Sequence, residues 1–280
     1  MRKPEWFKTN SKRNAMFHEV GSLVKELSLH TVCEEANCPN RTECYSHQTA
    51  TFMILGSHCT RNCTFCNVTK GNPEPVNVEE PENIAKAVEI LKLKHAVITS
   101  VTRDDLSDYG ASHFVNVIQR IREKTPRVSI EVLIPDMRGD WEQLAKIVKA
   151  KPDILNHNIE TIEHLYSQVR PMANYNRSLQ LIRETKIIDP TMFTKSGFML
   201  GLGETKEAVI KLMEDLLKAG CDIVTIGQYL PPSQQHFPLQ AYITPEEFIA
   251  YKTIGIQMGF KQVVSSPLTR SSYHAGEFFS

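Results

Sequence analysis

The segment that decides the fold is residues 50–66, which read Ala50-Thr-Phe-Met-Ile-Leu-Gly56-Ser-His-Cys59-Thr-Arg-Asn-Cys63-Thr-Phe-Cys66. Its first half is a short apolar run of the kind that forms a buried strand. Its second half places three cysteines directly after that strand with C-x3-C-x2-C spacing. Three soft thiolates this close together indicate iron–sulfur or zinc ligation. A complete ferredoxin-type site uses four cysteines, so a loop that supplies three leaves one iron with an open coordination position.

Beyond this segment, apolar runs rich in β-branched residues alternate with helical patterns, which is typical of successive βα units. The six strands are expected at residues 50–56, 95–102, 127–135, 153–160, 193–201 and 223–230. The helices are expected at residues 81–93, 112–124, 141–150, 176–188, 204–219 and 244–258, and a seventh apolar run covers 261–266. The pattern predicts an α/β fold but fits both an open parallel barrel and a doubly wound sheet. In either fold, functional groups gather at the C-terminal ends of the strands.

Composition and charge narrow the class of protein. The 280 residues are compatible with one domain, and the 32 basic and 32 acidic side chains cancel. No block of like charge and no long apolar run is present, so we expect neither nucleic acid nor membrane as a partner. Six of the seven cysteines lie between Cys33 and Cys66, while Cys221 stands alone. This clustered, odd-numbered set favours metal ligation in a reducing compartment over disulfides and predicts a soluble, cytoplasmic protein.

A second cysteine triplet lies upstream, in a polar stretch of residues 1–49 whose amphipathic part covers 16–27. It reads Cys33-Glu-Glu-Ala-Asn-Cys38-Pro-Asn-Arg-Thr-Glu-Cys44, a C-x4-C-x5-C pattern. Its spacing alone fits a zinc knob as well as an iron–sulfur cluster. For the downstream triplet, the alternative is a zinc site completed by His58 or His47.

The downstream loop and its setting resemble the radical S-adenosylmethionine superfamily, and further segments are similar to the lipoyl synthase family within it. These segments are Val32-Cys-Glu-Glu-Ala-Asn-Cys-Pro-Asn40, residues 50–63, Thr99-Ser-Val-Thr-Arg-Asp-Asp-Leu106, Asn156-His-Asn-Ile-Glu-Thr161, Lys195-Ser-Gly-Phe-Met-Leu-Gly-Leu-Gly-Glu204, Gly227-Gln-Tyr-Leu230 and Arg270-Ser-Ser-Tyr273. Two departures are visible. Tyr45 stands where tryptophan is usual, and Asp108-Tyr109-Gly110 stands where a glycine pair is expected after aspartate.

The resemblance implies an open partial TIM-type (β/α)6 barrel with extensions at both ends. Residues 1–49 would form an N-terminal extension carrying the auxiliary cluster cysteines, 50–260 the radical S-adenosylmethionine partial barrel, and 261–280 a C-terminal segment with a serine ligand. In the family, a four-iron four-sulfur cluster that binds S-adenosylmethionine takes the downstream triplet, here Cys59, Cys63 and Cys66. An auxiliary four-iron four-sulfur cluster takes the upstream triplet and a serine, here Cys33, Cys38, Cys44 and Ser272.

The implied activity is that of a sulfurtransferase of the radical class. It inserts two sulfur atoms at carbons 6 and 8 of a protein-bound octanoyl-lysine, using S-adenosylmethionine and sacrificing the auxiliary cluster. The implied partners are an octanoylated lipoyl-carrier domain (the E2 subunit of a 2-oxoacid dehydrogenase or the glycine cleavage H protein), an electron donor such as flavodoxin or ferredoxin, and an iron–sulfur carrier that rebuilds the cluster. The rivals are a biotin synthase or methylthiotransferase and, from another class, an electron carrier or zinc-stabilised binding protein.

Residues at the predicted strand ends are candidates for binding S-adenosylmethionine. The resemblance implies contacts from Asn158, Glu160 and Arg170 to its ribose and carboxylate. Thr102 and Asp104 would hold its methionine part, although loop solvation explains Asp104 equally well. Gln228 would lie near the adenine or the substrate channel, with core packing as the alternative. His95, His113 and His236 have no metal-ligand spacing and are interpreted as surface or hydrogen-bonded core residues.

Overall fold

The computed structural model describes residues 2–8, 13–47 and 50–272, which divide into two compact units. The N-terminal unit contains the described residues of 10–61 and 67–155 together with Ser272. The C-terminal unit contains the described residues of 1–9 together with 62–66 and 156–271. The chain therefore passes from one unit to the other inside the downstream cysteine loop and again within strand β7 (Ile154–Asn156).

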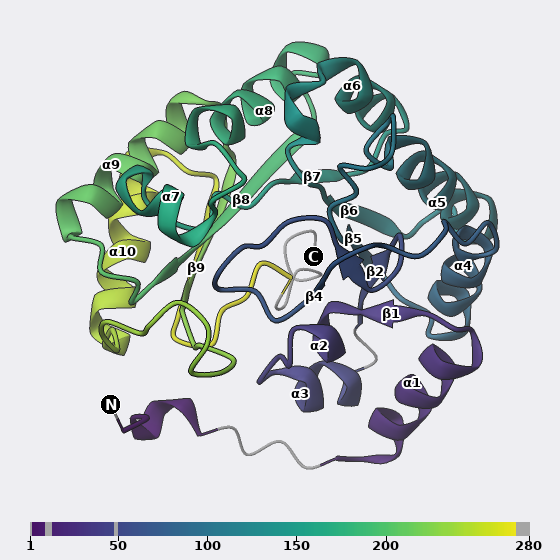
Figure 1. Ribbon diagram of the computed structural model, residues 1–280, viewed down its shortest axis with the longest axis horizontal. Coiled ribbons are helices and arrows are strands. Elements are labelled where there is room, and N and C mark those ends of the chain that lie inside the picture. The colour runs from purple at the N-terminus through teal and green to yellow at the C-terminus, as the bar shows by residue number, and fades with distance from the viewer. Residues whose placement is uncertain (1, 9–12, 48–49, 273–280) are drawn as a thin grey trace. The chain divides into compact units, whose positions relative to one another are not determined.

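The N-terminal unit is built on parallel strands β2 (Thr51–Ile54), β5 (His95–Ser100) and β6 (Ser129–Leu133). Thr51 of β2 pairs with Val97 of β5, and His95 pairs with Ser129 of β6. The short strand β1 (His30–Thr31) adds to β2 in the antiparallel direction. Helices α4 (Glu80–Ile90), α5 (Ala111–Lys124) and α6 (Trp141–Lys149) lie outside these strands (Figure 1).

Sequence patterns explain why these helices form and which face they bury. In α5 the apolar residues Phe114, Val117, Ile118 and Ile121 recur at helical spacing and are fully buried. Full burial of each such side chain contributes about 1.5–3 kcal/mol. Asp140 is the N-cap residue of α6, and its carboxylate accepts hydrogen bonds from backbone N–H groups of the first helical turn.

The described part of residues 13–47, which carries the upstream cysteines, contains three helices. Helix α1 (Ala15–Glu26) matches the predicted amphipathic stretch, whereas α2 (Val32–Glu35) and α3 (Arg41–Ser46) lie where the sequence analysis predicted no helix. Both are too short to show a helical repeat in the sequence. Thr31 caps α2 by accepting a hydrogen bond from the backbone N–H of Glu34, so Cys33 lies in the first turn of a helix.

The C-terminal unit is built on parallel strands β8 (Phe193–Leu200), β9 (Ile223–Gln228) and β10 (Gln262–Ser265). Its helices are α8 (Tyr175–Ile188), α9 (Lys206–Lys218) and α10 (Pro245–Met258), with the short α7 (Tyr166–Val169) before them. One buried apolar cluster joins these strands and helices, and Phe65 of the downstream cysteine loop packs against it. The remaining short elements of the two units are η1 (Glu5–Phe7), β3 (His58–Cys59), β4 (Thr69–Lys70), η2 (Met137–Gly139) and η3 (Glu163–Leu165).

An ion network fixes the N-terminal ends of β8 and β9 in this unit. The carboxylate of Asp222 lies 2.6 Å from Nζ of Lys186 and 2.8 Å from Nζ of Lys261. It also accepts a hydrogen bond from the backbone N–H of Thr194 at 3.0 Å. Burial by itself raises the pKa of Asp222, but the two lysines and the backbone bond outweigh burial and the pKa is lowered. Asp222 therefore stabilises the folded unit as a carboxylate.

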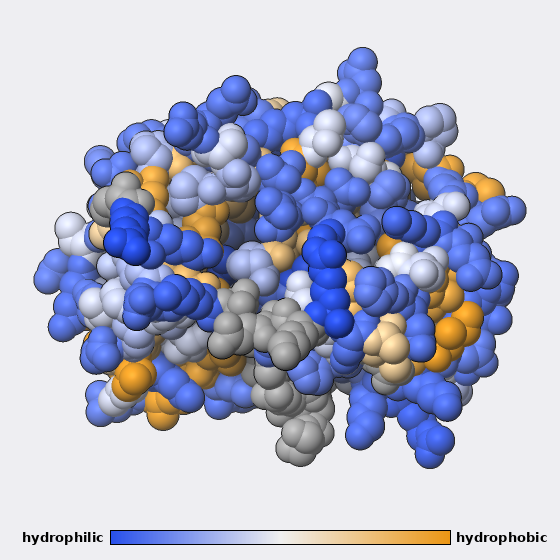
Figure 2. Space-filling view, turned by 90° about the horizontal axis from the view of Figure 1, so that it is seen from below, coloured by the Kyte–Doolittle hydropathy of each residue, from blue (hydrophilic) through white to orange (hydrophobic). Residues whose placement is uncertain are grey.

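The predicted α/β pattern is confirmed. All six expected strands and six expected helices are present, and β10 corresponds to the seventh apolar run. The division into an extension, a barrel and a C-terminal segment stays a prediction. No helix of the described residues is long and apolar enough to cross a membrane. The face seen in Figure 2 is covered mainly by hydrophilic residues, with hydrophobic residues in small groups.

Candidate active site

The downstream cysteine loop follows β2. Cys59 belongs to β3, which pairs with β4 through Cys59 and Lys70. The backbone carbonyl of Cys59 accepts a hydrogen bond from the N–H of Gly71 at 3.2 Å. Its sulfur accepts from the backbone N–H groups of Arg61 and Thr102, each at 3.4 Å. These two backbone donors fix the position of the Cys59 sulfur at the end of β3.

The segment after β5 holds this half of the loop in place. The carbonyl of Thr102 accepts hydrogen bonds from the backbone N–H and the hydroxyl of Thr60, both at 3.0 Å. Asp104 binds Arg61 through two bonds, Nε–Oδ2 at 2.8 Å and Nη2–Oδ1 at 2.9 Å. Thr102 and Asp104 thus position the cysteine loop, and their predicted contact with S-adenosylmethionine stays a prediction.

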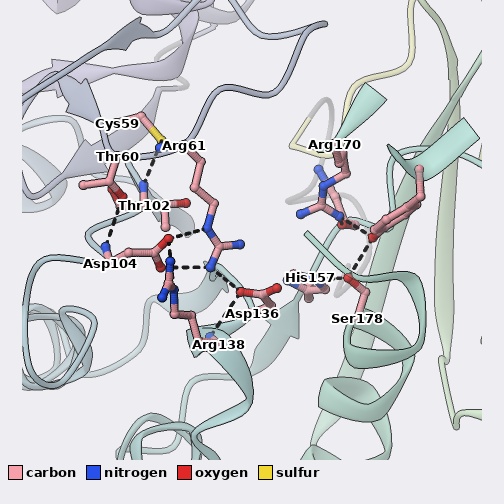
Figure 3. A network of polar contacts seen from close by, with 12 residues as sticks. Cys59, Thr60, Arg61, Thr102, Asp104, Asp136, Arg138, His157, Arg170 and Ser178 are labelled. Atoms are coloured by element: carbon pink, nitrogen blue, oxygen red, sulfur yellow. Dashed lines mark hydrogen bonds and ion pairs between the residues drawn. The ribbon is translucent and has the colours of Figure 1, made fainter. Parts of the chain in front are cut away.

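Arg61 lies at the centre of a buried ion network that the sequence analysis did not identify (Figure 3). Its guanidinium also contacts Asp136 at 2.6 Å, and Asp136 is fully buried. Arg138 approaches Asp104 at 3.4 Å from the more exposed side. Burial lowers the pKa of Arg61, but the hydrogen bonds to Asp104 and Asp136 outweigh burial and raise it. The only signal in the sequence was the place of Arg61 inside the cysteine motif.

The other half of the loop, residues 62–66, belongs to the C-terminal unit. The backbone N–H of Thr64 donates to the carbonyl of Val169 at 3.0 Å, and its hydroxyl donates to the carbonyl of Gln168 at 2.9 Å. The carbonyl of Thr64 accepts from the N–H of Phe237 at 2.9 Å. The backbone between Cys63 and Cys66 is therefore anchored on both sides.

The end of β7 carries polar groups suited to a ligand. Oδ1 of Asn158 and Oγ1 of Thr161 are buried without a hydrogen-bond partner. Such acceptors are costly to bury alone and fit a ligand that offers hydroxyl or ammonium donors. Glu160 has a left-handed backbone conformation with φ of 70°. Burial raises the pKa of Glu160. Arg170 and a hydrogen bond with Asn158 lower it, but burial outweighs them and the pKa stays raised.

Arg170 belongs to a second network in the C-terminal unit (Figure 3). Its Nη1 donates to the carbonyl of Asn158 at 2.8 Å and to the hydroxyl of Tyr166 at 2.7 Å. The hydroxyl of Tyr166 lies 2.8 Å from Oγ of Ser178, which in turn lies 2.9 Å from Nε2 of His157. The structure therefore brings Asn158, Glu160 and Arg170 together, and their contacts with S-adenosylmethionine stay a prediction.

Gln228 is buried at the end of β9, and the chain itself uses both ends of its amide. Nε2 donates to the carbonyls of Leu200, Tyr229 and Ala241 at 3.0–3.1 Å. Oε1 accepts from the N–H of Ile243 at 2.8 Å. Gln228 thus fixes the loop that follows β9, and its contact with adenine or substrate stays a prediction.

The upstream triplet is brought together by α2 and α3. Burial and the neighbouring Cys38 raise the pKa of the Cys33 thiol to about 12, and burial, Cys33 and Cys38 raise that of Cys44 to about 12. Burial and neighbouring negative charge thus disfavour the thiolates of Cys33 and Cys44, and a bound metal centre would supply the positive charge that offsets both. Tyr45, the departure from the family pattern, is buried and bonds through its hydroxyl to Thr31 at 2.7 Å.

The donor sets fit metal centres. Soft thiolates suit iron–sulfur clusters or zinc, and three per site leave room for a further ligand. In the part of the chain that the structure describes, no group of three or more His, Cys, Asp or Glu side chains surrounds the position of a single metal ion. Ser272 belongs to the same compact unit as the upstream triplet, and Tyr273 of its motif lies outside the described residues. The assignment of all seven ligands stays a prediction.

His113 and His95 are hydrogen-bonded core residues, one of the two interpretations given in the sequence analysis. His113 is buried and its Nε2 lies 2.7 Å from Glu80. His95 is also buried, and its Nδ1 lies 2.7 Å from Oγ of Ser129. At the second departure from the family pattern, Tyr109 and Gly110 both have left-handed backbone conformations. Tyr109 thus adopts the conformation for which a glycine was expected.

Comparison with known proteins agrees with this geometry. The family model of the radical SAM superfamily matches residues 53–227. Lipoyl synthase from Alkaliphilus metalliredigens is 55% identical over 99% of this chain and 95% of its own length. Lipoyl synthase from Caldicellulosiruptor saccharolyticus is 54% identical over 99% of this chain and 97% of its own.

Solved structures show the same fold at low sequence identity. Methylornithine synthase is 17% identical with a TM-score of 0.58, covering 89% of this chain and 82% of that one. HydG, a maturase of the FeFe-hydrogenase, is 14% identical with a TM-score of 0.60, covering 98% of this chain and 71% of that one. The open α/β fold with a mostly parallel sheet is therefore shared with these proteins, and the resemblance found in the sequence is confirmed. The chain belongs to the radical SAM superfamily and, within it, to the lipoyl synthase family.

Proposed function

We propose that this chain acts as a lipoyl synthase, inserting sulfur at carbons 6 and 8 of an octanoyl group held on a lysine of a carrier protein. The observation that carries the proposal is the pair of separate cysteine triplets. The upstream one forms a group of neighbouring thiols in a chain 51–55% identical to lipoyl synthases over nearly its whole length. A radical enzyme that only cleaved S-adenosylmethionine would need the downstream triplet alone.

The two triplets have different roles in this proposal. Cys59, Cys63 and Cys66 would hold a four-iron four-sulfur cluster, and Cys33, Cys38, Cys44 and Ser272 would hold the auxiliary one. When bound, the first supplies the electron that cleaves S-adenosylmethionine and the second supplies the sulfur that is inserted. A serine oxygen is a harder ligand than a thiolate, which suits a labile iron in a cluster that is taken apart.

The residues at the strand ends would bind and orient S-adenosylmethionine. Asn158 offers an unpaired buried acceptor for a ribose hydroxyl or an ammonium group. Arg170, held by Tyr166, offers a cation to the cofactor carboxylate, and Glu160 lies beside both. Thr102, Asp104 and Gln228 would act mainly by holding the cysteine loop and the loop after β9 in place.

Exclusion of water is the other task of this site. A radical in contact with solvent is lost, so the reacting carbon must be held close to the radical precursor in a closed site. The anchoring of Thr64 and Gln228 fixes the loops that would line such a site. The substrate is a lipoyl-carrier domain. We further propose flavodoxin or ferredoxin as the reductant, an iron–sulfur carrier that rebuilds the spent cluster, and a cytoplasmic location.

Mass spectrometry of an octanoylated carrier domain tests the proposal. The domain is incubated anaerobically with the reconstituted enzyme, S-adenosylmethionine and dithionite. The expected product carries two additional sulfur atoms, and a matched incubation without S-adenosylmethionine should leave the octanoyl group unchanged. Formation of 5′-deoxyadenosine without any sulfur insertion would contradict the proposal.

Metal and sulfide analysis separates this function from the zinc alternative. Two four-iron clusters require about eight irons and about eight sulfides per chain after anaerobic reconstitution. Zinc bound at either triplet, with no sulfide at that triplet, would contradict the proposed ligation.

A further inference from the structure

The backbone turn between β2 and the downstream cysteine loop has an unusual conformation. Leu55 and Gly56 follow each other with φ of 70° and 91°. Glycine adopts this left-handed region freely, but leucine does so only where its surroundings hold it there. The surroundings of Leu55 therefore decide how the chain leaves the strand and enters the loop.

Both backbone polar groups of Leu55 are held by buried charged side chains. Its N–H donates to Oε2 of Glu80 at 2.9 Å, and its carbonyl accepts from Nη1 of Arg103 at 3.1 Å. Glu80 and Arg103 are each only 3% exposed. Arg103 is itself fixed by Asp105, which binds Nε and Nη2 of the guanidinium. Two buried side chains thus hold the two peptide groups that flank the Cα atom of Leu55.

Glu80 is in turn held by His113. Nε2 of His113 lies 2.7 Å from the same carboxylate oxygen that binds Leu55. The contact is a hydrogen bond between the imidazole of His113 and the carboxyl group of Glu80. Glu80 begins α4 and His113 lies in the first turn of α5, so two helices fix one oxygen atom against the turn.

The surroundings of the turn are closely packed. A Cβ atom on Gly56 would lie 2.7 Å from Oε2 of Glu74, and one on Gly110 would lie 2.3 Å from Cδ1 of Leu55. Cys59 follows four residues after Leu55, and its sulfur meets the N–H of Thr102 at 3.4 Å. A rotation at Leu55 would carry the whole segment, and the Cys59 sulfur with it, away from that donor.

We propose that Glu80, oriented by His113, is a positioning residue that holds Leu55 in the left-handed conformation and thereby sets the position of Cys59. The proposal rests on the proposed function, in which Cys59 is a cluster ligand. Glu80 touches neither substrate nor cofactor and acts through the backbone of Leu55.

Hydrogen exchange of the Leu55 amide in the metal-free chain is the direct test. Glu80→Ala removes the acceptor and should speed this exchange about tenfold or more, whereas Glu80→Gln keeps a carbonyl oxygen and should largely restore protection. Glu89→Ala is the matched control, because Glu89 lies exposed on the same helix. It should leave the exchange unchanged.

Reconstitution supplies the second readout. Glu80→Ala should lose about half of the iron and the change in the electron paramagnetic resonance spectrum on adding S-adenosylmethionine, while the iron at the upstream triplet remains. Glu80→Gln should recover both signals. If Glu80→Ala does not fold, the same exchange measurement is made on His113→Leu. Faster exchange of the Leu55 amide in that variant supports the proposal, and unchanged exchange overturns it.

Two results would overturn the proposal outright. One is normal protection of the Leu55 amide together with full iron loading in folded Glu80→Ala. The other is a Glu80→Gln variant as impaired as Glu80→Ala, since the acceptor would then not be what matters. The exchange measurement needs neither cluster nor product. If the native chain made no lipoyl product, the proposed function would be wrong, but the exchange measurement would still test the role of Glu80.

Discussion

Replacement of Arg61 by methionine should destabilise the N-terminal unit strongly. The guanidinium is 4% exposed and binds Asp104, 8% exposed, and Asp136, which is fully buried. Methionine fills much of the same volume but removes the guanidinium that both buried carboxylates bind. Removal of one partner from a buried ion pair costs about 3–5 kcal/mol. The half-exposed guanidinium of Arg138 approaches Asp104 at 3.4 Å, but Arg138 reaches Asp136 through its uncharged backbone N–H, which does not replace the charge of Arg61.

Urea unfolding of the metal-free chain under reducing conditions, followed by circular dichroism, measures this loss as a free energy of unfolding. Arg120→Met is the matched control, because Arg120 contacts Glu123 at 2.7 Å on the surface with both side chains more than half exposed. Exposed pairs of this kind contribute about 0–1 kcal/mol. If Arg61→Met cost no more than Arg120→Met, burial would not be what makes the network stabilising and the reasoning would be wrong.

Three further outcomes follow from the site. Cys33→Ala should still cleave S-adenosylmethionine but yield no thiolated product, whereas Cys63→Ala should abolish both; chromatography of 5′-deoxyadenosine and mass spectrometry of the carrier separate the two, and normal lipoyl product from Cys33→Ala would refute the sulfur-donor assignment. Tyr45→Phe removes one buried hydrogen bond and should cost about 1 kcal/mol of unfolding free energy, and a cost indistinguishable from zero would mean that this bond does not stabilise the cysteine helices. Asp222→Asn should cost on the order of 1–3 kcal/mol at pH 7. Because the pKa of Asp222 is lowered in the folded chain, its contribution is present above the ordinary aspartate pKa and is lost as pH falls through the lower folded value. The difference from the native chain in urea unfolding should therefore shrink towards acid pH, and a constant difference would contradict this.

The regular elements could be predicted from the sequence because their patterns are local. The strands and helices of the βα units, from Ala50 to Ser266, appear close to where apolar runs and helical periods placed them. The short helices α2 and α3 could not be predicted in this way. Four or six residues are too few to show a helical period, and Asn40 before α3 makes no side-chain cap bond that would mark the start of that helix.

The candidate site was only partly predictable. The cysteines were recognisable from their spacing, and Asn158 and Glu160 from their place at a strand end, whereas Arg170 was added by the family resemblance. The roles of Thr102 and Asp104 in holding Thr60 and Arg61 could not be read from the sequence. Those partners are more than forty residues away along the chain, and no local pattern encodes which polar groups meet across such a distance.

The sequence by itself determined the class of fold, the family and the two groups of thiols, since periodicity and motif spacing are properties of neighbours along the chain. Only the tertiary structure decided which polar side chains support those thiols. It paired Arg61 with Asp104 and Asp136, and it turned Glu80, held by His113, towards the backbone of Leu55. Burial makes such pairings obligatory, because a charge or a backbone N–H removed from water must find a partner, and the fold alone determines which partners are within reach.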